Sequence, residues 1–191
     1  MSNNKWPEQW TVRLGPGYEI GLPLTDIGGG FFIYSFDMTG EAEWNRVAAR
    51  SLSEKLAGRD FSSFITVQTK SSGLMQAIAD PYKYYLELRK SYKGFMSEPR
   101  HISVQSITTQ ERQELWIGKE KYGRFRGKKL CFIDDVVSTG GTIDAVLEMA
   151  KEIDIEISVI ACVLTEGIRR EEYKGIPLIS LDHIPLPGKI G

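Results

Sequence analysis

The sequence predicts an α/β fold built on a mostly parallel sheet that is covered on both faces. Continuous apolar runs with the length of buried strands occupy residues 64–67, 130–133 and 157–164. Segments in which apolar residues recur with helical spacing, at 41–56 and 142–152, precede or separate these runs. Strands that alternate with helices in this way form βαβ units. Ligands of such sheets bind at the carboxyl ends of the strands, so we expect the functional site at that edge.

The first forty residues hold two runs of alternating apolar residues, 18–24 and 31–36. These runs predict strands because alternate strand residues share one face. A turn is expected between them, at 26–30, where three consecutive glycines occur. The helix at 41–56 should end at Gly58. Its apolar face consists of Trp44, Val47, Ala48, Leu52 and Leu56.

The later elements follow from the same patterns. A short helix at 74–79 should end before Pro81. Further strands are expected at 84–88, 102–107 and 114–117. The apolar face of the helix at 142–152 consists of Ile143, Val146, Leu147 and Ala150.

A chain of 191 residues is long enough for one well-buried domain, and we expect residues 1–191 to form one. The 24 basic and 25 acidic residues leave a net charge of −1, so no overall positive field favours nucleic acid or an anionic membrane as a partner. The two cysteines, Cys131 and Cys162, are too few for a disulfide framework. Because the sequence lacks an apolar leader and a segment of spanning length, we expect a cytoplasmic protein.

The segment with the clearest chemistry runs from Leu130 to Thr142. Two carboxylates, Asp134 and Asp135, follow four apolar strand residues, and a short loop of hydroxyl residues and glycines then leads into a helix. The glycines let backbone N–H groups approach a ligand, while the hydroxyls and the first amides of the helix form an anion-binding site. The carboxylates suit sugar hydroxyls or a metal ion. This combination predicts a sugar phosphate as the ligand.

Other interpretations of this loop are weaker. It lacks the Gly-Lys-Ser/Thr ending of a P-loop and the Gly-x-Gly-x-x-Gly pattern of dinucleotide-binding folds. A plain helix start is the remaining alternative, with Ser138 or Thr139 as N-cap and two solvated aspartates. The carboxylate pair directly behind a buried strand favours the ligand site.

Residues 130–142 resemble the 5-phosphoribosyl-1-pyrophosphate (PRPP) binding motif of the type I phosphoribosyltransferases at nearly every position. A weaker similarity extends from about residue 41 to the C-terminus, and the adenine and xanthine branch of the family is the most similar. The resemblance implies a doubly wound α/β core of about 41–174. It also implies a small hood, from about 1–36 and 175–191, that contacts the acceptor base.

By this resemblance, Asp134 and Asp135 are the catalytic residues and hold the ribose hydroxyls. Mg²⁺ is the implied cofactor, held through the substrate and by these two carboxylates. The 5′-phosphate is expected to be bound by Val137, Ser138, Thr139, Gly140, Gly141 and Thr142.

A second hydroxylated loop that ends in glycine, residues 69–73, follows the strand predicted at 64–67. By the same resemblance it binds pyrophosphate, with Lys70 supplying positive charge and Ser71 and Ser72 supplying donors. Enzymes of the adenine and xanthine type usually carry an acidic residue where Lys70 stands, so this chain departs from their pattern. A surface turn is the alternative interpretation.

Positive charge is concentrated within residues 83–129, where twelve Lys/Arg and five Asp/Glu give a net of +7. We expect this charge to neutralise phosphate, with residues 91–125 forming a loop that closes over the ligand. Arg89, Lys90 and Lys93 match the Arg-Lys position of the family and are expected to contact pyrophosphate. A solvated basic face is the alternative.

The implied reaction is displacement of pyrophosphate from C1 of PRPP by a ring nitrogen of a purine base, as in purine salvage. Glu166 stands where enzymes for 6-oxopurines often carry a lysine, and a carboxylate suits an exocyclic amino group, so adenine is favoured over xanthine. Phe31 or Phe32 is a candidate for stacking on the base, with core packing as the alternative. His101 and His183 are expected to be surface or hood residues.

A regulator that keeps the PRPP site as a sensor is the competing interpretation, and Lys70 keeps it open. The resemblance suggests a homodimer that binds PRPP and a purine base. The length leaves no room for an added DNA-binding domain, so neither nucleic acid nor a membrane is expected as a partner.

Overall fold

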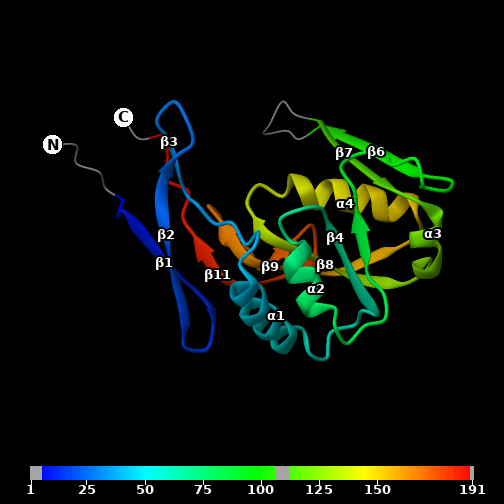
Figure 1. Ribbon diagram of the computed structural model, residues 1–191, viewed down its shortest axis with the longest axis horizontal. Helices are drawn as coiled ribbons and strands as arrows, with labels where there is room; N and C mark the ends of the chain where they lie inside the picture. The colour runs from blue at the N-terminus through cyan, green and yellow to red at the C-terminus, as the bar shows by residue number, and fades with distance from the viewer. Residues whose placement is uncertain (1–5, 106–111, 190–191) are drawn as a thin grey trace.

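The structure is a computed structural model that describes residues 6–105 and 112–189. Its centre is a six-stranded sheet with the strand order β10-β11-β9-β8-β4-β5 (Figure 1). Every neighbouring pair in this sheet is parallel except the β10–β11 hairpin at one edge. The strands are β4 (Ser63–Val67), β5 (Leu86–Leu88), β8 (Lys129–Val137), β9 (Glu156–Glu166), β10 (Glu172–Tyr173) and β11 (Ile176–Ile184). The predicted mostly parallel α/β sheet is confirmed.

Helices cover both faces of this sheet, as a doubly wound fold requires. The helices are α1 (Ala42–Leu56), α2 (Ser72–Ile78), α3 (Lys119–Tyr122) and α4 (Gly141–Glu152), with a short 3-10 turn η1 (Gly123–Phe125). α1 and α2 lie on one face and α4 lies on the other (Figure 1). On β8, Cys131 and Ile133 join the core beneath α1 and α2. Leu130 and Phe132 join the core beneath α4, because successive strand residues point to opposite faces.

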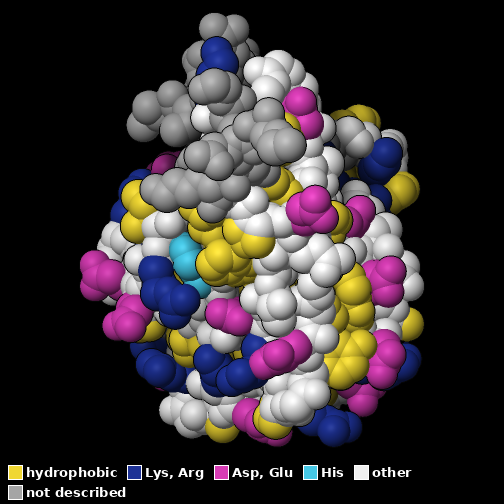
Figure 2. Space-filling view, turned by 90° about the vertical axis from the view of Figure 1, so that its left-hand side faces the viewer, with side chains coloured by type: hydrophobic (Ala, Val, Ile, Leu, Met, Phe, Trp, Pro, Cys, Tyr) yellow, Lys and Arg dark blue, Asp and Glu magenta, His cyan; other side chains and the backbone are white. Residues whose placement is uncertain are grey.

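The amino-terminal region forms a separate four-stranded antiparallel sheet with the order β1-β2-β3-β12, here called the hood sheet. Its strands are β1 (Gln9–Gly15), β2 (Tyr18–Asp26), β3 (Phe31–Tyr34) and β12 (Gly188–Lys189). β1 was not predicted, although Trp10, Val12 and Leu14 alternate with polar residues. The predicted hood included 175–191, but β11 lies in the central sheet beside β9, so only β12 joins the hood sheet there. Figure 2 views this side of the molecule, where apolar side chains gather among charged ones.

Residues 91–125, predicted to be a closing loop, contain regular structure. β6 (Arg100–Gln105) and β7 (Arg112–Ile117) form an antiparallel pair that contacts α4. These two strands overlap the strands predicted at 102–107 and 114–117, and they dock beside the central sheet. Closure of this segment over a ligand stays a prediction. Residues 106–111 of the predicted loop lie outside the described residues.

β8 extends further than predicted. The apolar pattern predicted a strand over 130–133, with the two aspartates beyond its end. In the parallel register with β9, however, Asp134 lies opposite Cys162 and Val137 lies opposite Thr165. The strand continues because β9 is long enough to supply backbone partners there. Both aspartates therefore lie inside a strand, at its carboxyl end.

Among the described residues, no helix combines the length and the apolar character needed to cross a membrane.

Phe132→Ala is expected to lower the free energy of unfolding by about 3–5 kcal/mol, because it leaves a cavity in the core. Phe132 is fully buried in β8, whereas Phe95 is 68% exposed. Phe95→Ala is the matched control and should change stability by less than about 1 kcal/mol. Urea unfolding measures both values, and similar losses for the two variants would contradict the placement of Phe132.

Candidate functional site

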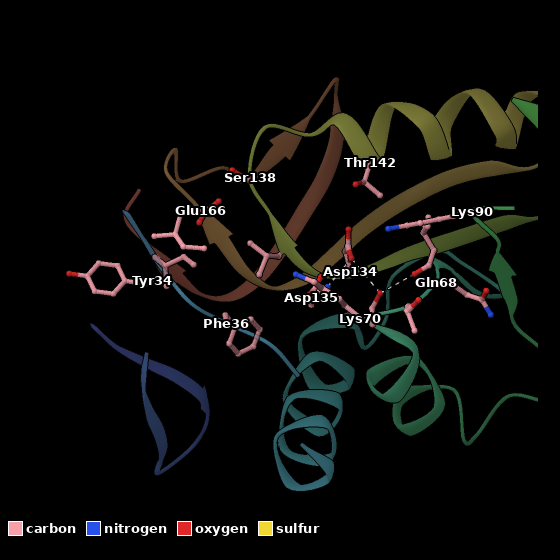
Figure 3. Close-up of a pocket in the computed structure, with 16 residues that line it drawn as sticks. Tyr34, Phe36, Gln68, Lys70, Lys90, Asp134, Asp135, Ser138, Thr142 and Glu166 are labelled. Atoms are coloured by element: carbon pink, nitrogen blue, oxygen red, sulfur yellow. Dashed lines mark hydrogen bonds between the residues drawn. The ribbon is translucent and has the colours of Figure 1, made fainter. Parts of the chain in front are cut away.

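A cavity of about 370 Å³ lies at the carboxyl ends of β4 and β8 (Figure 3). Along the chain, β4 is followed by β5 on one side, and the chain then returns to β8 and β9 on the other side of β4. The strand order therefore reverses between β4 and β8, and such a reversal opens a crevice between the loops that follow the two strands. The cavity lies at the sheet edge predicted from the sequence.

Asp134 and Asp135 both line the cavity. Oδ1 of Asp134 accepts a hydrogen bond from the backbone N–H of Asp135 at 3.0 Å and another from Oγ of Ser71 at 3.4 Å. Burial raises the pKa of Asp134 well above its usual value, and the neighbouring carboxylate of Asp135 raises this pKa further. The charged form of Asp134 is therefore under-stabilised, and a hydroxyl donor or a cation in the cavity would stabilise it.

The loop after β8 supplies an anion-binding wall. Ser138 and Thr142 line the cavity on the α4 side (Figure 3). The first hydrogen bond of α4 runs from the N–H of Asp144 to the C=O of Gly140, so the N–H groups of residues 141–143 have no partner within the helix. Such N–H groups and the positive end of the helix dipole favour a phosphate. The other predicted residues of this loop, which are not among the cavity-lining residues, are Val137, Thr139, Gly140 and Gly141.

The β10–β11 hairpin packs against this loop from outside the cavity. Gly140 adopts a φ of +93°, a left-handed conformation that favours glycine. A Cβ on Gly140 would lie 2.3–2.5 Å from atoms of the Tyr173 ring, so the ring lies directly against the loop. The Tyr173 hydroxyl donates to Oδ1 of Asp144 at 3.0 Å, and Nζ of Lys174 lies 2.7 Å from the same oxygen. Sequence reasoning missed Tyr173, because no local pattern links it to a loop so much earlier in the chain.

The loop after β4 forms the opposite wall of the cavity through Thr69, Lys70 and Ser71. Ser71 is fully buried, and its Oγ lies 3.0 Å from Oγ1 of Thr66. Thr66 in turn donates to the C=O of Ile133 in β8 at 2.8 Å. These hydroxyls tie the loop to the strand that carries the aspartates. Lys70 is exposed and brings positive charge to this wall.

Two of the predicted pyrophosphate ligands are engaged elsewhere. Oγ of Ser72 donates to Oε1 of Glu87 in β5 at 2.7 Å. Nη1 of Arg89 donates to Oε1 of Gln68 at 3.4 Å. Neither Ser72 nor Arg89 lines the cavity, whereas Gln68, which the sequence analysis did not single out, does. Arg89 and Glu87 instead line a second cavity of about 290 Å³, between β5 and β7.

Lys90 is the residue of the predicted Arg-Lys group that reaches the main cavity, and Figure 3 shows its amino end directed into it. Lys93 is exposed and is not a lining residue. Other basic residues of the 83–129 segment form ion pairs away from the cavity. These pairs are Arg100 with Glu152 at 3.4 Å, Lys119 with Glu98 at 2.6 Å, Arg126 with Asp154 at 3.5 Å and Lys129 with Asp60 at 2.7 Å. A solvated basic face therefore describes much of this segment.

The end of the cavity next to the hood sheet is mainly apolar. Its lining residues are Ile33, Tyr34, Phe36 and Ile184, with the carboxylate of Glu166 beside them (Figure 3). Phe31, the predicted stacking residue, is not among them. It begins β3 and lies opposite Lys189 of β12, about 10 Å along the strand from Tyr34. Phe32, the other candidate for stacking, is not a lining residue either, whereas Phe36, which follows β3, is.

Neither histidine lines the cavity. Nδ1 of His183 lies 2.9 Å from Oγ1 of Thr165, and burial lowers the pKa of His183. The ring of His101 stacks on Trp116 with 4.0 Å between the ring centroids. His183 thus lies in β11 of the central sheet, not in the hood as expected, and His101 lies in β6.

The chain is similar to known proteins over most of its length. The family model for the phosphoribosyl transferase domain matches residues 42–185. The hypoxanthine/guanine phosphoribosyltransferases of Methanothermobacter thermautotrophicus and Methanocaldococcus infernus are 38% and 34% identical over 83 and 104 residues, which is 44% and 51% of this chain. The chain spans only 39% and 53% of the length of these two relatives.

Solved structures show the same fold. An adenine phosphoribosyltransferase from Thermoanaerobacter pseudethanolicus superposes with a TM-score of 0.69 and 18% identity, covering 85% of this chain and 95% of that one. One from Rhodothermus marinus gives a TM-score of 0.61 at 18% identity, covering 92% and 94% of the two chains.

Gly140→Ala is expected to lower the free energy of unfolding more than Gly127→Ala. Both glycines have positive φ, so each alanine adds strain of about 1–2 kcal/mol. Only Gly140 faces the Tyr173 ring, since the space around Gly127 is open. Urea unfolding should show the difference, and adding Tyr173→Ala to Gly140→Ala should remove it. Equal losses for the two glycine variants would contradict the ring contact.

Asp134→Asn is expected to raise the free energy of unfolding at neutral pH. A carboxyl group with a raised pKa binds its proton more tightly in the folded protein than in the unfolded chain. The fold therefore loses stability as the pH rises through the range between the pKa of Asp134 in the unfolded chain and its higher pKa in the folded protein. Asparagine carries no charge and keeps an acceptor for the N–H of Asp135. Urea unfolding between pH 4 and 8 should give a smaller decline for this variant than for the native protein. Asp80→Asn, at an exposed aspartate, is the control and should show the same dependence of unfolding free energy on pH as the native protein. The native pH dependence in Asp134→Asn would refute the argument.

Proposed function

The chain belongs to the phosphoribosyl transferase domain family, and on that premise we propose that it transfers the 5-phosphoribosyl group of PRPP to a purine base. The products are pyrophosphate and a nucleoside 5′-monophosphate. One observation carries the proposal. A single cavity brings together the aspartate pair of β8, the anion-binding start of α4 and the hydroxylated loop after β4.

Each part of PRPP has a complementary wall in this cavity. Ser138, Thr142 and the first amides of α4 would bind the 5′-phosphate. Asp134 and Asp135 would accept hydrogen bonds from the ribose hydroxyls. The pyrophosphate would lie toward the loop after β4. Its partners there would be Lys70 and Lys90, while Ser71 holds the loop against Asp134.

The reaction is a substitution at C1 of the ribose. The C1–O bond breaks and its electron pair leaves with pyrophosphate, while the lone pair of a ring nitrogen forms the new N–C1 bond and the base releases a proton. Positive charge develops on the sugar, so the Asp134 and Asp135 carboxylates would stabilise it, and Lys70 and Lys90 would stabilise the leaving group. Positioning and electrostatics thus supply the catalysis.

The donor set fits Mg²⁺ that arrives with the substrate. Mg²⁺ binds through one or two carboxylates together with substrate phosphates, and Asp134 and Asp135 offer two carboxylates in the cavity. Among residues 6–105 and 112–189, no group of three or more histidine, cysteine or acidic side chains forms a self-sufficient metal site. When bound, Mg²⁺ would neutralise charge on the departing pyrophosphate.

The acceptor base would occupy the apolar end of the cavity next to the hood sheet. Phe36 and Ile33 offer apolar surface there, and Glu166 offers a hydrogen-bond acceptor. A carboxylate accepts from an exocyclic amino group and repels a keto oxygen, so Glu166 favours adenine. The relatives with similar sequence carry hypoxanthine/guanine names and the similar structures carry adenine names, so the base must be tested directly.

A PRPP sensor without turnover is the second candidate, and Lys70 is the observation that favours it. Lys70 lines the cavity at the position where the chain departs from the family pattern. The protein should be incubated with Mg²⁺–PRPP and adenine, hypoxanthine, guanine or xanthine, and pyrophosphate release measured. Turnover that is fastest with adenine supports the proposal. PRPP binding without turnover on any base supports the sensor, and no PRPP binding overturns both.

Asp134→Asn combined with Asp135→Asn is expected to reduce pyrophosphate release at least about 10²-fold, because the variant loses both carboxylates that face the ribose. Circular dichroism and urea unfolding should show an intact fold. Unchanged activity in a folded double variant would refute the assignment of these residues.

A further inference from the structure

We propose that Glu87 is a positioning residue that holds both ends of the loop 69–71 in the shape that binds pyrophosphate. The inference rests on the proposed function, since it names how one wall of that site is kept in place. Glu87 does not line the main cavity, so its role is exerted through the loop.

One carboxylate spans the loop. Oε2 of Glu87 accepts from Nε2 of Gln68 at 2.9 Å, immediately before the loop. Oε1 accepts from Oγ of Ser72 at 2.7 Å, immediately after the loop and at the start of α2. The residues between these two anchors are the ones that line the cavity wall. Because hydrogen bonds to a charged acceptor are short and strong, the two contacts fix the separation of the loop ends.

The position of Glu87 in β5 explains how it reaches the loop. Leu86 and Leu88 are buried in the core, and the side chain between them leaves the strand on the opposite side. β5 pairs with β4, with Leu88 opposite Val67, so the loop after β4 starts beside Glu87. Figure 3 shows the Gln68 side chain turned away from the aspartate pair.

The hydrogen bonds also fix which way the Gln68 amide points. Its Nε2 donates to Glu87, and its Oε1 accepts from Nη1 of Arg89 at 3.4 Å. A flipped amide would place the NH₂ group against a guanidinium, which has only donors, and the oxygen against a carboxylate, which has only acceptors. Arg89 therefore acts through Gln68, and the sequence-based role for Arg89 as a direct pyrophosphate contact becomes a role in this chain of contacts.

The charge of Glu87 points to positioning rather than ligand binding. A carboxylate near a site for pyrophosphate repels that ligand, so an apolar residue at this position would favour binding on charge alone. Both oxygens of Glu87 are instead occupied by donors from the loop ends. The hydroxyl of Ser72 is likewise consumed by Glu87, which makes Ser72 an anchor of the loop.

The test is Glu87→Gln, with Mg²⁺–pyrophosphate and AMP as probes in separate calorimetric titrations. The amide can still accept from Gln68 and can donate to the Ser72 hydroxyl, but both contacts lose the charged acceptor that makes them short and strong. We expect the Kd for Mg²⁺–pyrophosphate to rise about tenfold, the loss expected for a hydrogen bond to a charged group. The Kd for AMP should stay within twofold, because its phosphate binds the loop after β8. Glu54→Gln, at an exposed glutamate of α1, is the charge-matched control and should change neither Kd.

A compensating variant separates positioning from general damage. In Glu87→Gln with Gln68→Glu, the new carboxylate at 68 can accept from the new amide and from Arg89, while Ser72 still has an acceptor. Most of the lost pyrophosphate affinity should return. Native affinity in Glu87→Gln, or an equal loss of pyrophosphate and AMP affinity, would overturn the inference. A native protein that binds neither probe would overturn the proposed function itself, and the inference with it.

Discussion

Parallel pairing of β4, β8 and β9 is the constraint on which the site depends. Parallel strands end at the same edge of a sheet, so the polar residues that follow each strand meet there although they are far apart in the sequence. The order of the strands in the sheet also sets the order in which their loops line the cavity. The loop with Lys70 follows β4, the aspartates and the anion-binding turn belong to β8, and Glu166 ends β9. An elongated ligand with different chemistry along its length fits such an arrangement.

Positive and negative groups alternate across the cavity, from the loop after β4 to the start of α4. Lys70 and Lys90 lie at one side, the aspartate pair lies in the middle, and α4 presents the N–H groups of its first turn at the other wall. The strained member is Asp134, whose charge is disfavoured by burial and by Asp135. The fold tolerates this because Ser71 and a backbone N–H donate to its carboxylate. The buried charge of Asp134 thus lowers the stability of the fold at the place where the proposed ligand would contact the protein.

Much of the fold was predictable because β8 and β9 are continuous apolar runs and α1 and α4 have helical apolar faces. The aspartates and the loop after β8 were predictable because their chemistry is local. Tyr173, Gln68 and Phe36 were not, since each reaches its place through pairing between distant segments. The strands β6 and β7 were expected, but their position was not, because they pair with each other and contact α4, which the isolated runs do not reveal.

The contact between Tyr173 and Gly140 has a consequence for synthesis of the protein. Tyr173 bonds to Asp144 across 29 residues of chain and belongs to a hairpin that includes β11. While the ribosome is still making β9, the turn after β8 therefore lacks the ring that rests on it. A nascent chain that has already formed β4, β8 and α4 would hold an incompletely braced phosphate-binding turn, and the capacity to bind would mature only after the last strands emerge.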